Sequence, residues 1–558
     1  MTDHVGSAGS AKAARTVLLA LALQQLLMAY DSTAMNVALS TIVADLGTTL
    51  TGVQAAIALY SLVMAAFMIT GSKLGLRHGH LRMFTLGTVL YGAGAVVTAL
   101  SPGLPVMVLG WSLLEGLGAA LVFPAVMSIA TVLFEGAART KALALVATMV
   151  GVGGALGPLL GGLITSVLTW RASFLMEAAV TLVVIFMVRG AREPAAPGVH
   201  RPFDGVGVVL SAVGCALVVL ATLLAGRFGL FTSREDVVLF GRVVIAAGDL
   251  SLTVVLVAVG VAVLAAFGWW EMRLVARGED PLVRVAVLRD RTTSTGSAAL
   301  AVQFLVTAGT MFLIPVFLQT TLSYGALASG VTQLPSTVAL VAAATAASKL
   351  AGSGRIGRKA LVVAGFGLVV VGLVIIALTM RPHSTGWSLL PGLAVLGLGL
   401  GACVVLTDLV QSSAPPGQVS DVAGLSRSSS YLGQSVGVAL SGAVLLGALL
   451  GSFTAGVNTS TALSATQKDE LTTAVRQSSQ TAAVSDDQAR STLARAGVTG
   501  ATEEEIVRLN GQARITGLRA SVLVMAGFAL VGVVLALAIP VRPRRTPGVV
   551  GGAVPPPA

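Results

Sequence analysis

The segment Gly151-Val-Gly-Gly-Ala-Leu-Gly157-Pro158-Leu-Leu-Gly161-Gly162 decides how this chain is interpreted. Gly153, Gly157 and Gly161 recur every four residues, so they share one face of an apolar helix and let a second backbone approach closely. Pro158 bends that helix, which a membrane tolerates only where neighbouring groups satisfy the freed backbone. The segment therefore predicts a bent and closely packed membrane helix.

The composition places the whole chain in a membrane. Hydrophobic residues make up 55% and charged residues 11% of the 558 residues, and the mean hydropathy is +0.90. A soluble domain is usually less than half apolar and about one-quarter charged. The net charge of +11 does not indicate a nucleic-acid partner, because the basic residues are dispersed among loops without interleaved aromatic residues.

Fourteen apolar stretches of about 20 residues, the length that spans a bilayer, lie between residues 16 and 540. Alternate loops, counted from the N-terminus, carry most of the lysines and arginines, so the positive-inside rule predicts that both termini are cytoplasmic. We expect an all-α polytopic membrane protein, in which residues 1–15 form a cytoplasmic tail. The other expected units are a six-helix bundle over 16–190, a linker with two additional helices over 191–292, a second six-helix bundle over 293–541 and a disordered tail over 542–558.

Two features support this division. Ser72-Lys73-Leu74 after the second span is echoed by Ser348-Lys349-Leu350 after the tenth, as two parallel halves would require. An exterior loop over 451–517 interrupts the second bundle. Three sequences that match a helix capping box, beginning at Ser464, Ser485 and Thr502, predict two or three short helices in that loop.

The first span carries Asp31-Ser32-Thr33-Ala-Met-Asn36-Val37-Ala38-Leu39. This string resembles the signature of the drug:proton antiporter 2 family, the fourteen-helix branch of the major facilitator superfamily. The glycine segment at 151–162 is similar to the fifth-helix antiporter motif of exporters in that superfamily. Further similarities are Trp170-Arg171, Phe203-Asp204, Trp270-Glu271 with Pro281-Leu282, and Gln319 with Tyr324. The resemblance implies a fold of two six-helix bundles plus two central helices. It also implies a proton-driven exporter of drugs or toxic compounds, including antibiotics, in a bacterial inner membrane.

The chain departs from the family in two places. In the cytoplasmic gate loop, which holds Lys73, Arg77 and Gly79, Leu76 occupies the position of an aspartate that is thought to latch the gate. In the fourth span Ser112 replaces the family's intramembrane arginine, and Glu115 follows in the same motif. These changes put the usual latch and the usual intramembrane cation in doubt.

Four acids, Asp31, Glu115, Glu177 and Asp408, fall inside the predicted spans, where we find no clearly placed lysine or arginine. An acid at the centre of a membrane costs about 2.5–3.5 kcal/mol even on an insertion scale, so it tends to mark function. Burial and mutual repulsion both favour the protonated form. We therefore interpret the four as proton- and substrate-coupling candidates, with Asp31 and Glu115 foremost, at which a proton and a cationic substrate compete.

Other classes of function stay open at this point. All five histidines fall in predicted tails or loops, and no catalytic or metal-ligand constellation is apparent, so we expect neither an enzyme nor a bound metal or cofactor. A sensor or scaffold would have no need of buried acids. Within transporters, export of a lipid or cell-envelope precursor is the main alternative to a small amphipathic or cationic organic compound. We expect a monomer in contact with membrane lipid, and no nucleic-acid partner.

Overall fold

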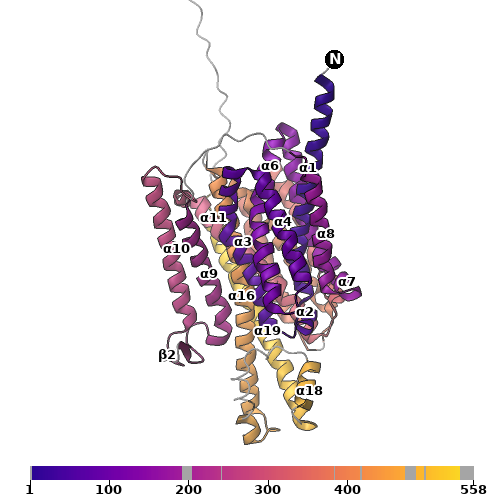
Figure 1. Cartoon of the computed structure of the whole chain (residues 1–558). Helices are drawn as coiled ribbons and strands as arrows, with labels where there is room; N and C mark the ends of the chain where they lie inside the picture. The colour runs from indigo at the N-terminus through magenta and orange to yellow at the C-terminus, as the bar shows by residue number, and fades with distance from the viewer. Residues whose placement is uncertain are drawn as a thin grey trace, which may run out of the picture.

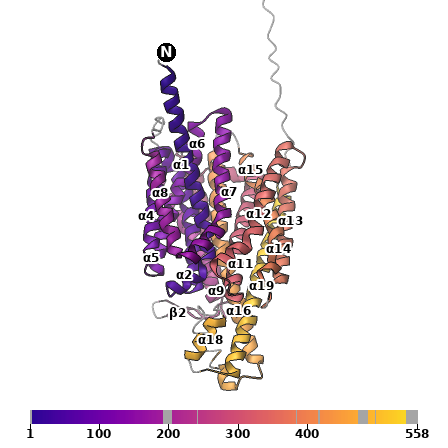
Figure 2. The ribbon, with the colours of Figure 1, turned by 90° about the vertical axis from the view of Figure 1, so that its right-hand side faces the viewer.

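The computed structural model describes residues 3–191, 204–239, 242–382, 384–414, 418–469, 471, 486–495 and 498–540. Within them, 14 helices are long and apolar enough to cross a membrane, which confirms the expected number. The expected disordered tail over 542–558 lies outside the described residues. Helices run roughly parallel to one long axis, with the first half of the chain beside the second (Figures 1 and 2).

The first half is a six-span bundle, and its first helix begins at Asp3, within the segment expected to be a tail. Its spans are built from α1 (Asp3–Val37), α3 (Leu50–His78), α4 (His80–Ala99), the run α5 (Leu104–Met107), η1 (Val108–Glu115) and α6 (Gly116–Leu133), α7 (Gly136–Val167) and α8 (Trp170–Val188). A short helix, α2 (Leu39–Asp45), follows the first span. The stretch η1 is a π-helix, a form that often occurs at functional sites.

The two additional spans are α9 (Gly205–Phe228) and α10 (Leu252–Ala276), which lie at the side of the molecule (Figure 1). A β-hairpin that the sequence analysis did not predict connects them. Its strands β1 (Val237–Leu239) and β2 (Arg242–Ile245) pair antiparallel. Apolar β-branched residues such as Val243 and Val244 favour a strand, but the segment is too short to stand out from the spans around it.

The second half has six more spans. They are formed by α11 (Arg291–Val316) with η3 (Phe317–Thr321), α12 (Ala326–Ser353), α13 (Arg358–Thr379), the run η4 (Gly386–Leu389), α14 (Leu390–Cys403) and α15 (Val405–Gln411), α16 (Val419–Thr459) and α19 (Ala501–Ala538). A short 3-10 helix, η2 (Val285–Arg289), precedes α11.

The described part of the exterior loop contains two short helices, over 465–469 and over 486–495, as the sequence predicted, but the two flanking helices also extend into it. Helices α16 and α19 continue past the bundle, and α18 (Asp486–Arg495) lies against their protruding ends (Figure 1). Phe453 and Val457 of α16 pack with Ile506 and Leu509 of α19 in a small apolar core. The Ser464 capping box is confirmed by reciprocal bonds with Gln467, at 2.9 and 3.3 Å. The Thr502 box is wrong, because α19 already begins at Ala501, and Ser485 lies outside the described residues.

We call the face where α16, α18 and α19 protrude the loop face, and the opposite face, at which α1 begins and α19 ends, the terminus face (Figures 1 and 2). The halves meet tightly toward the loop face. Gln319 of η3 donates to the carbonyl of Val37 at 2.9 Å and accepts from the amide of Ser40 at 3.0 Å. The amide of Leu327 donates to Ser166 at 3.1 Å. These bonds hold the two bundles together on that side.

Candidate functional site

Three of the four candidate acids form one cluster inside the first bundle. Asp31 comes from α1, Glu115 from the end of η1 and Glu177 from α8. One carboxylate oxygen of each lies within 4.8 Å of the others. The side chains are almost completely buried, with exposures of 1%, 0% and 1% in that order. Residues 31, 115 and 177, far apart in the sequence, thus form a single acidic site, called here the carboxyl cluster.

Neutral donors surround the carboxyl cluster. The indole nitrogen of Trp111 donates to both oxygens of Asp31, at 2.9 and 3.1 Å. The Tyr91 hydroxyl donates to Glu177 at 2.9 Å, and the Thr98 hydroxyl donates to Glu115 at 3.3 Å. In the described part of the chain no lysine or arginine forms an ion pair with the three acids.

One oxygen of the cluster has no partner. Oε2 of Glu115 is buried and makes no hydrogen bond, although a buried polar atom without a partner is costly. Protonation of a neighbouring carboxyl would supply the missing donor. A hard metal cation would need about six oxygen ligands, whereas Trp111 can only donate and the cavity beside Asp31 and Glu177, of about 10 Å³, has room for about one water. The arrangement therefore suits protons better than a metal ion.

Asp408 lies away from this cluster. It sits on α15 with 64% of its side chain exposed and pairs with Arg358 at 3.0 Å. The structure thus brings together three of the four candidates and leaves Asp408 at the terminus-face end of its helix, where a carboxylate reaches water cheaply.

The glycine segment lies in α7, between the two halves. Gly153, Gly157 and Gly161 face α1: a Cβ at Gly157 would overlap Thr33 and lie 2.8 Å from the Tyr30 carbonyl. Gly162 faces α12, where a Cβ would lie 2.6 Å from the Ala326 carbonyl. Pro158 belongs to the same contact, since its carbonyl abuts Gly330 of α12. The spacing therefore serves the close helix packing that the sequence predicted.

The gate loop is a tight turn. Gly79 has φ of 97°, a conformation that favours glycine, and it separates α3 from α4. Leu76 and Arg77 are exposed. Lys73 instead pairs with Asp280, which follows α10, at 3.7 Å. Lys73 of this loop thus forms an ion pair with an acid in the segment that follows α10, the second of the two additional helices.

The motifs at Asp204 and at Trp270-Glu271 form hydrogen bonds at the ends of the two additional helices. Trp270 donates to Asp204 at 3.0 Å, and Asp204 caps α9 by accepting from Gly207. Glu271, which the sequence analysis did not place inside a span, is fully buried and accepts from the amide of Val283 at 3.1 Å. These bonds tie α9, α10 and the chain that follows them.

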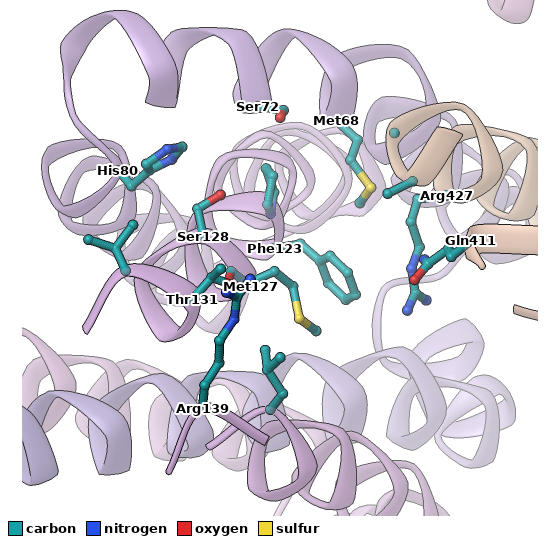
Figure 3. A pocket seen from close by; sticks show the side chains of 15 residues that line it. Met68, Ser72, His80, Phe123, Met127, Ser128, Thr131, Arg139, Gln411 and Arg427 are labelled. Carbon is teal, nitrogen blue, oxygen red and sulfur yellow. The ribbon is translucent and has the colours of Figure 1, made fainter. Parts of the chain in front are cut away.

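A cavity of about 610 Å³ lies between the halves (Figure 3). It is bounded by the later part of α3, the ends of α6 and α15, and the beginnings of α4, α7 and α16, so it lies toward the terminus face. None of the three clustered acids lines it. His80, expected in a loop, begins α4 and does line it.

Arg427 is the functional candidate that the sequence analysis missed. The apolar stretch of this span begins only at about residue 427, but α16 begins at Val419, so Arg427 lies two turns inside the helix and lines the cavity. Ser112, which stands where the family has its arginine, is buried and donates to the Ala56 carbonyl at 2.8 Å. Among the described residues, the cation that lines the cavity from within a span thus belongs to the second half of the chain, whereas the fourth span has Ser112 at the family's arginine position.

Two six-span bundles around a central cavity, with buried acids in one of them, define a polytopic membrane transporter. The chain belongs to the Major Facilitator Superfamily, whose family model matches residues 21–438. The transporter class, expected in place of an enzyme, is thereby confirmed, and the 14 spans and the relatives agree with the drug:proton antiporter 2 branch.

Two curated relatives illustrate that membership. The probable actinorhodin transporter of Streptomyces coelicolor is 30% identical over 437 residues, which cover 77% of this chain and 72% of that protein. The multidrug resistance protein Stp of Mycobacterium tuberculosis is 26% identical, covering 77% and 75%. A crystal structure of a bacterial homologue of the human lysosomal transporter Spinster matches with a TM-score of 0.58 at 14% identity, covering 95% of this chain and 99% of that one. This last likeness concerns the fold.

Proposed function

We propose that this protein is a proton-coupled exporter of small organic compounds in a bacterial cytoplasmic membrane. The observation that carries the proposal is the carboxyl cluster, in which Asp31, Glu115 and Glu177 are buried together without a basic partner among the described residues. Intramembrane acids are expensive and commonly form proton relays. The names of the relatives, an antibiotic transporter and a multidrug resistance protein, support an organic compound as the cargo.

The spacing of the cluster gives the reason for proton binding. Two unit charges 4.8 Å apart repel by about 3.5 kcal/mol at an effective dielectric constant of about 20. Three charges would meet this repulsion in each pair, in addition to the cost of leaving water. Taking up a proton removes both costs. Losing that proton makes the site unstable until the surrounding helices rearrange, which is the property that a proton-driven cycle requires.

Alternating access is supported by the asymmetry of the two faces. Bonds from Gln319 to the end of α1 close the halves toward the loop face, while the cavity lies toward the terminus face. The excess of lysine and arginine in loops on the terminus face supports a cytoplasmic position for that face. In this proposal, the cavity receives its cargo from the cytoplasmic side.

Coupling in this proposal is indirect. The clustered acids do not line the cavity, so proton and cargo occupy different places. The contacts between them run through α1 and α7: Asp31 and Thr33 lie on α1, Thr33 donates to the Gly154 carbonyl of α7 at 3.3 Å, and Pro158 abuts Gly330 of the second half. A change of protonation at Asp31 that shifts α1 would be transmitted to the contact between the halves through close-packed backbone.

The test is transport by purified protein in liposomes with an imposed proton gradient, using 2-(hydroxymethyl)anthraquinone as the probe. We expect Asp31→Asn to abolish gradient-driven accumulation while the protein still binds the probe, because the amide keeps the size and hydrogen bonding but cannot release a proton. Glu177→Gln should act in the same way. The matched control is Asp249→Asn, the same chemical change at an exposed position.

The expected outcome for the control is transport at the wild-type rate. Wild-type transport by Asp31→Asn and Glu177→Gln under the same gradient would show that the cluster is a structural feature. Accumulation by the wild-type protein that is unaffected by collapse of the gradient would refute proton coupling itself.

A further inference from the structure

The cavity between the halves has a polarisable wall of aromatic and methionine side chains. Phe123 and Met127 of α6 and Met68 of α3 line it, and Tyr431 of α16 meets the edge of the Phe123 ring with centroids 6.3 Å apart. Aromatic rings and methionine sulphur make favourable contacts with other aromatic surfaces. The volume of about 610 Å³ is within the usual range for a site that encloses an organic molecule. The volume and the aromatic and thioether side chains of the wall suit a planar aromatic compound.

The charge in the cavity is positive. Arg427 of α16 enters from the second half, with its guanidinium carbon 4.9 Å from the centre of the Phe123 ring. Figure 3 shows this side chain beside Gln411 and next to Phe123. Arg139, at the start of α7, reaches the same space from another side. No aspartate or glutamate is among the lining residues of the described chain.

Arg427 is not neutralised from outside the cavity. Within the residues that the structure describes, it forms no ion pair. Two acids at this end of the bundle are paired with other cations: Asp408 pairs with Arg358 and Asp280 with Lys73. Asp421 is six residues before Arg427 on α16 and does not line the cavity, since six residues place it on a different face of the helix.

From this arrangement we propose that the cavity binds a planar aromatic anion, whose acidic group is held by Arg427 while its ring lies against Phe123. A guanidinium offers two parallel N–H donors that match the two oxygens of a carboxylate. The Gln411 amide beside it supplies another donor. A cationic compound would meet an unpaired positive charge and no acid. This inference rests on the proposed export function and specifies the class of cargo, which differs from the cationic compound that the sequence suggested.

The test is binding to purified protein in lipid nanodiscs by three probes with the same ring system. They are anthraquinone-2-carboxylate, 2-(hydroxymethyl)anthraquinone and 2-(aminomethyl)anthraquinone, which at neutral pH are anionic, neutral and cationic. Equilibrium dialysis without a proton gradient gives the three affinities. We expect the carboxylate to bind about tenfold more tightly than the neutral probe, which corresponds to one charge-assisted hydrogen-bonded pair of about 1.4 kcal/mol, and the cation to bind most weakly.

Variants then assign the preference to one residue. Arg427→Gln should weaken carboxylate binding about tenfold and leave the neutral probe nearly unchanged, whereas Arg427→Lys should keep part of the preference because it keeps the charge. Arg355→Gln, which removes an equal charge from the exposed turn between α12 and α13, is the matched control and should keep the full preference.

The wild-type order of affinities decides the proposal even if Arg427→Gln does not fold. Tightest binding by the cation, or equal affinities for all three probes, would overturn it. A carboxylate preference that survives both Arg427 substitutions would also overturn it. Because binding is measured without a gradient, these outcomes are separate from a failure of proton-driven transport, which would contradict the proposed function and leave the anion site in place.

Discussion

A close approach between α1 and α7 can be tested with two substitutions three residues apart. Gly157→Ala adds a Cβ that overlaps Thr33 and lies 2.8 Å from the Tyr30 carbonyl oxygen. Gly154→Ala, in the same helix, adds a Cβ with nothing within 4 Å. Both substitutions carry the same gain in helix propensity, about 0.5–1 kcal/mol, so the difference between them isolates the packing at the interface.

The structure sets the size of that difference. Rotation of Thr33 would relieve the first overlap, but it would give up the bond from its hydroxyl to the Gly154 carbonyl, which measures 3.3 Å. The Tyr30 carbonyl is backbone and cannot rotate away, so α1 has to move by about half an ångström to restore a normal contact. Overpacking of this kind costs about 1–3 kcal/mol. We expect Gly157→Ala to be less stable than Gly154→Ala by about that amount.

Reversible unfolding of the purified protein in mixed detergent micelles measures the difference directly. Gradient-driven transport of the anthraquinone probe gives a second readout, because in our proposal α1 and α7 transmit the protonation state. Gly154→Ala should transport as the wild type does, and Gly157→Ala should transport more slowly. Equal stability and equal transport for the two variants would refute the close packing on which the coupling argument depends.

Three further predictions follow from other parts of the molecule. Cysteines placed at Ala465 and Arg355 should react with an impermeant maleimide from opposite sides of the membrane. Reaction of both from one side would contradict the arrangement of the spans. The two natural cysteines are buried and should not interfere. Phe453→Ala should destabilise the small core between α16 and α19 by about 3–5 kcal/mol. Limited proteolysis should then cut within 451–517 faster than in the wild type, and an unchanged rate of cleavage would count against that core. The pKa of Asp45 is lowered by its hydrogen bond from Trp170 and by Arg171. The Asp45 carboxylate therefore stabilises the fold above its unfolded pKa of about 3.9, and this stabilisation is lost as the pH falls through the folded pKa. The difference in unfolding free energy between wild type and Asp45→Asn should be larger at pH 7 than at pH 3, and a difference that grows on acidification would contradict the assignment.

The spans and the glycine contacts were predictable because their signals are local. A run of about 20 apolar residues must cross the bilayer whatever its neighbours are, and glycines four residues apart must share a helix face. The exterior loop was less predictable, since α16 and α19 continue into water with a polar composition that resembles a loop. Their apolar contacts, such as Phe453 with Leu509, depend on two segments about 50 residues apart in the sequence.

The direction in which each acid points was beyond the sequence. A helix that is apolar on every side carries no pattern to show which face meets its neighbours, so Glu177 and Asp408 looked alike. In the structure, Glu177 turns inward to accept from Tyr91, while Asp408 turns outward to Arg358. Arg427 was missed because a polar run, Ser428 to Ser430, follows it and resembles the end of a span.

These placements change the mechanism that the sequence suggested. Competition between a proton and a cation requires both to reach the same carboxylate oxygen. Glu115 is fully buried inside the first bundle, whereas the cavity between the bundles holds Arg427 and no acid among its described lining residues. A bulky compound cannot reach the first site, and a proton finds no carboxylate in the second. Coupling between them must therefore act through the conformation of the protein, with each site favouring one arrangement of the two halves. An anionic cargo suits this division, because outward movement of an anion and inward movement of a proton are both favoured by a membrane potential that is negative inside.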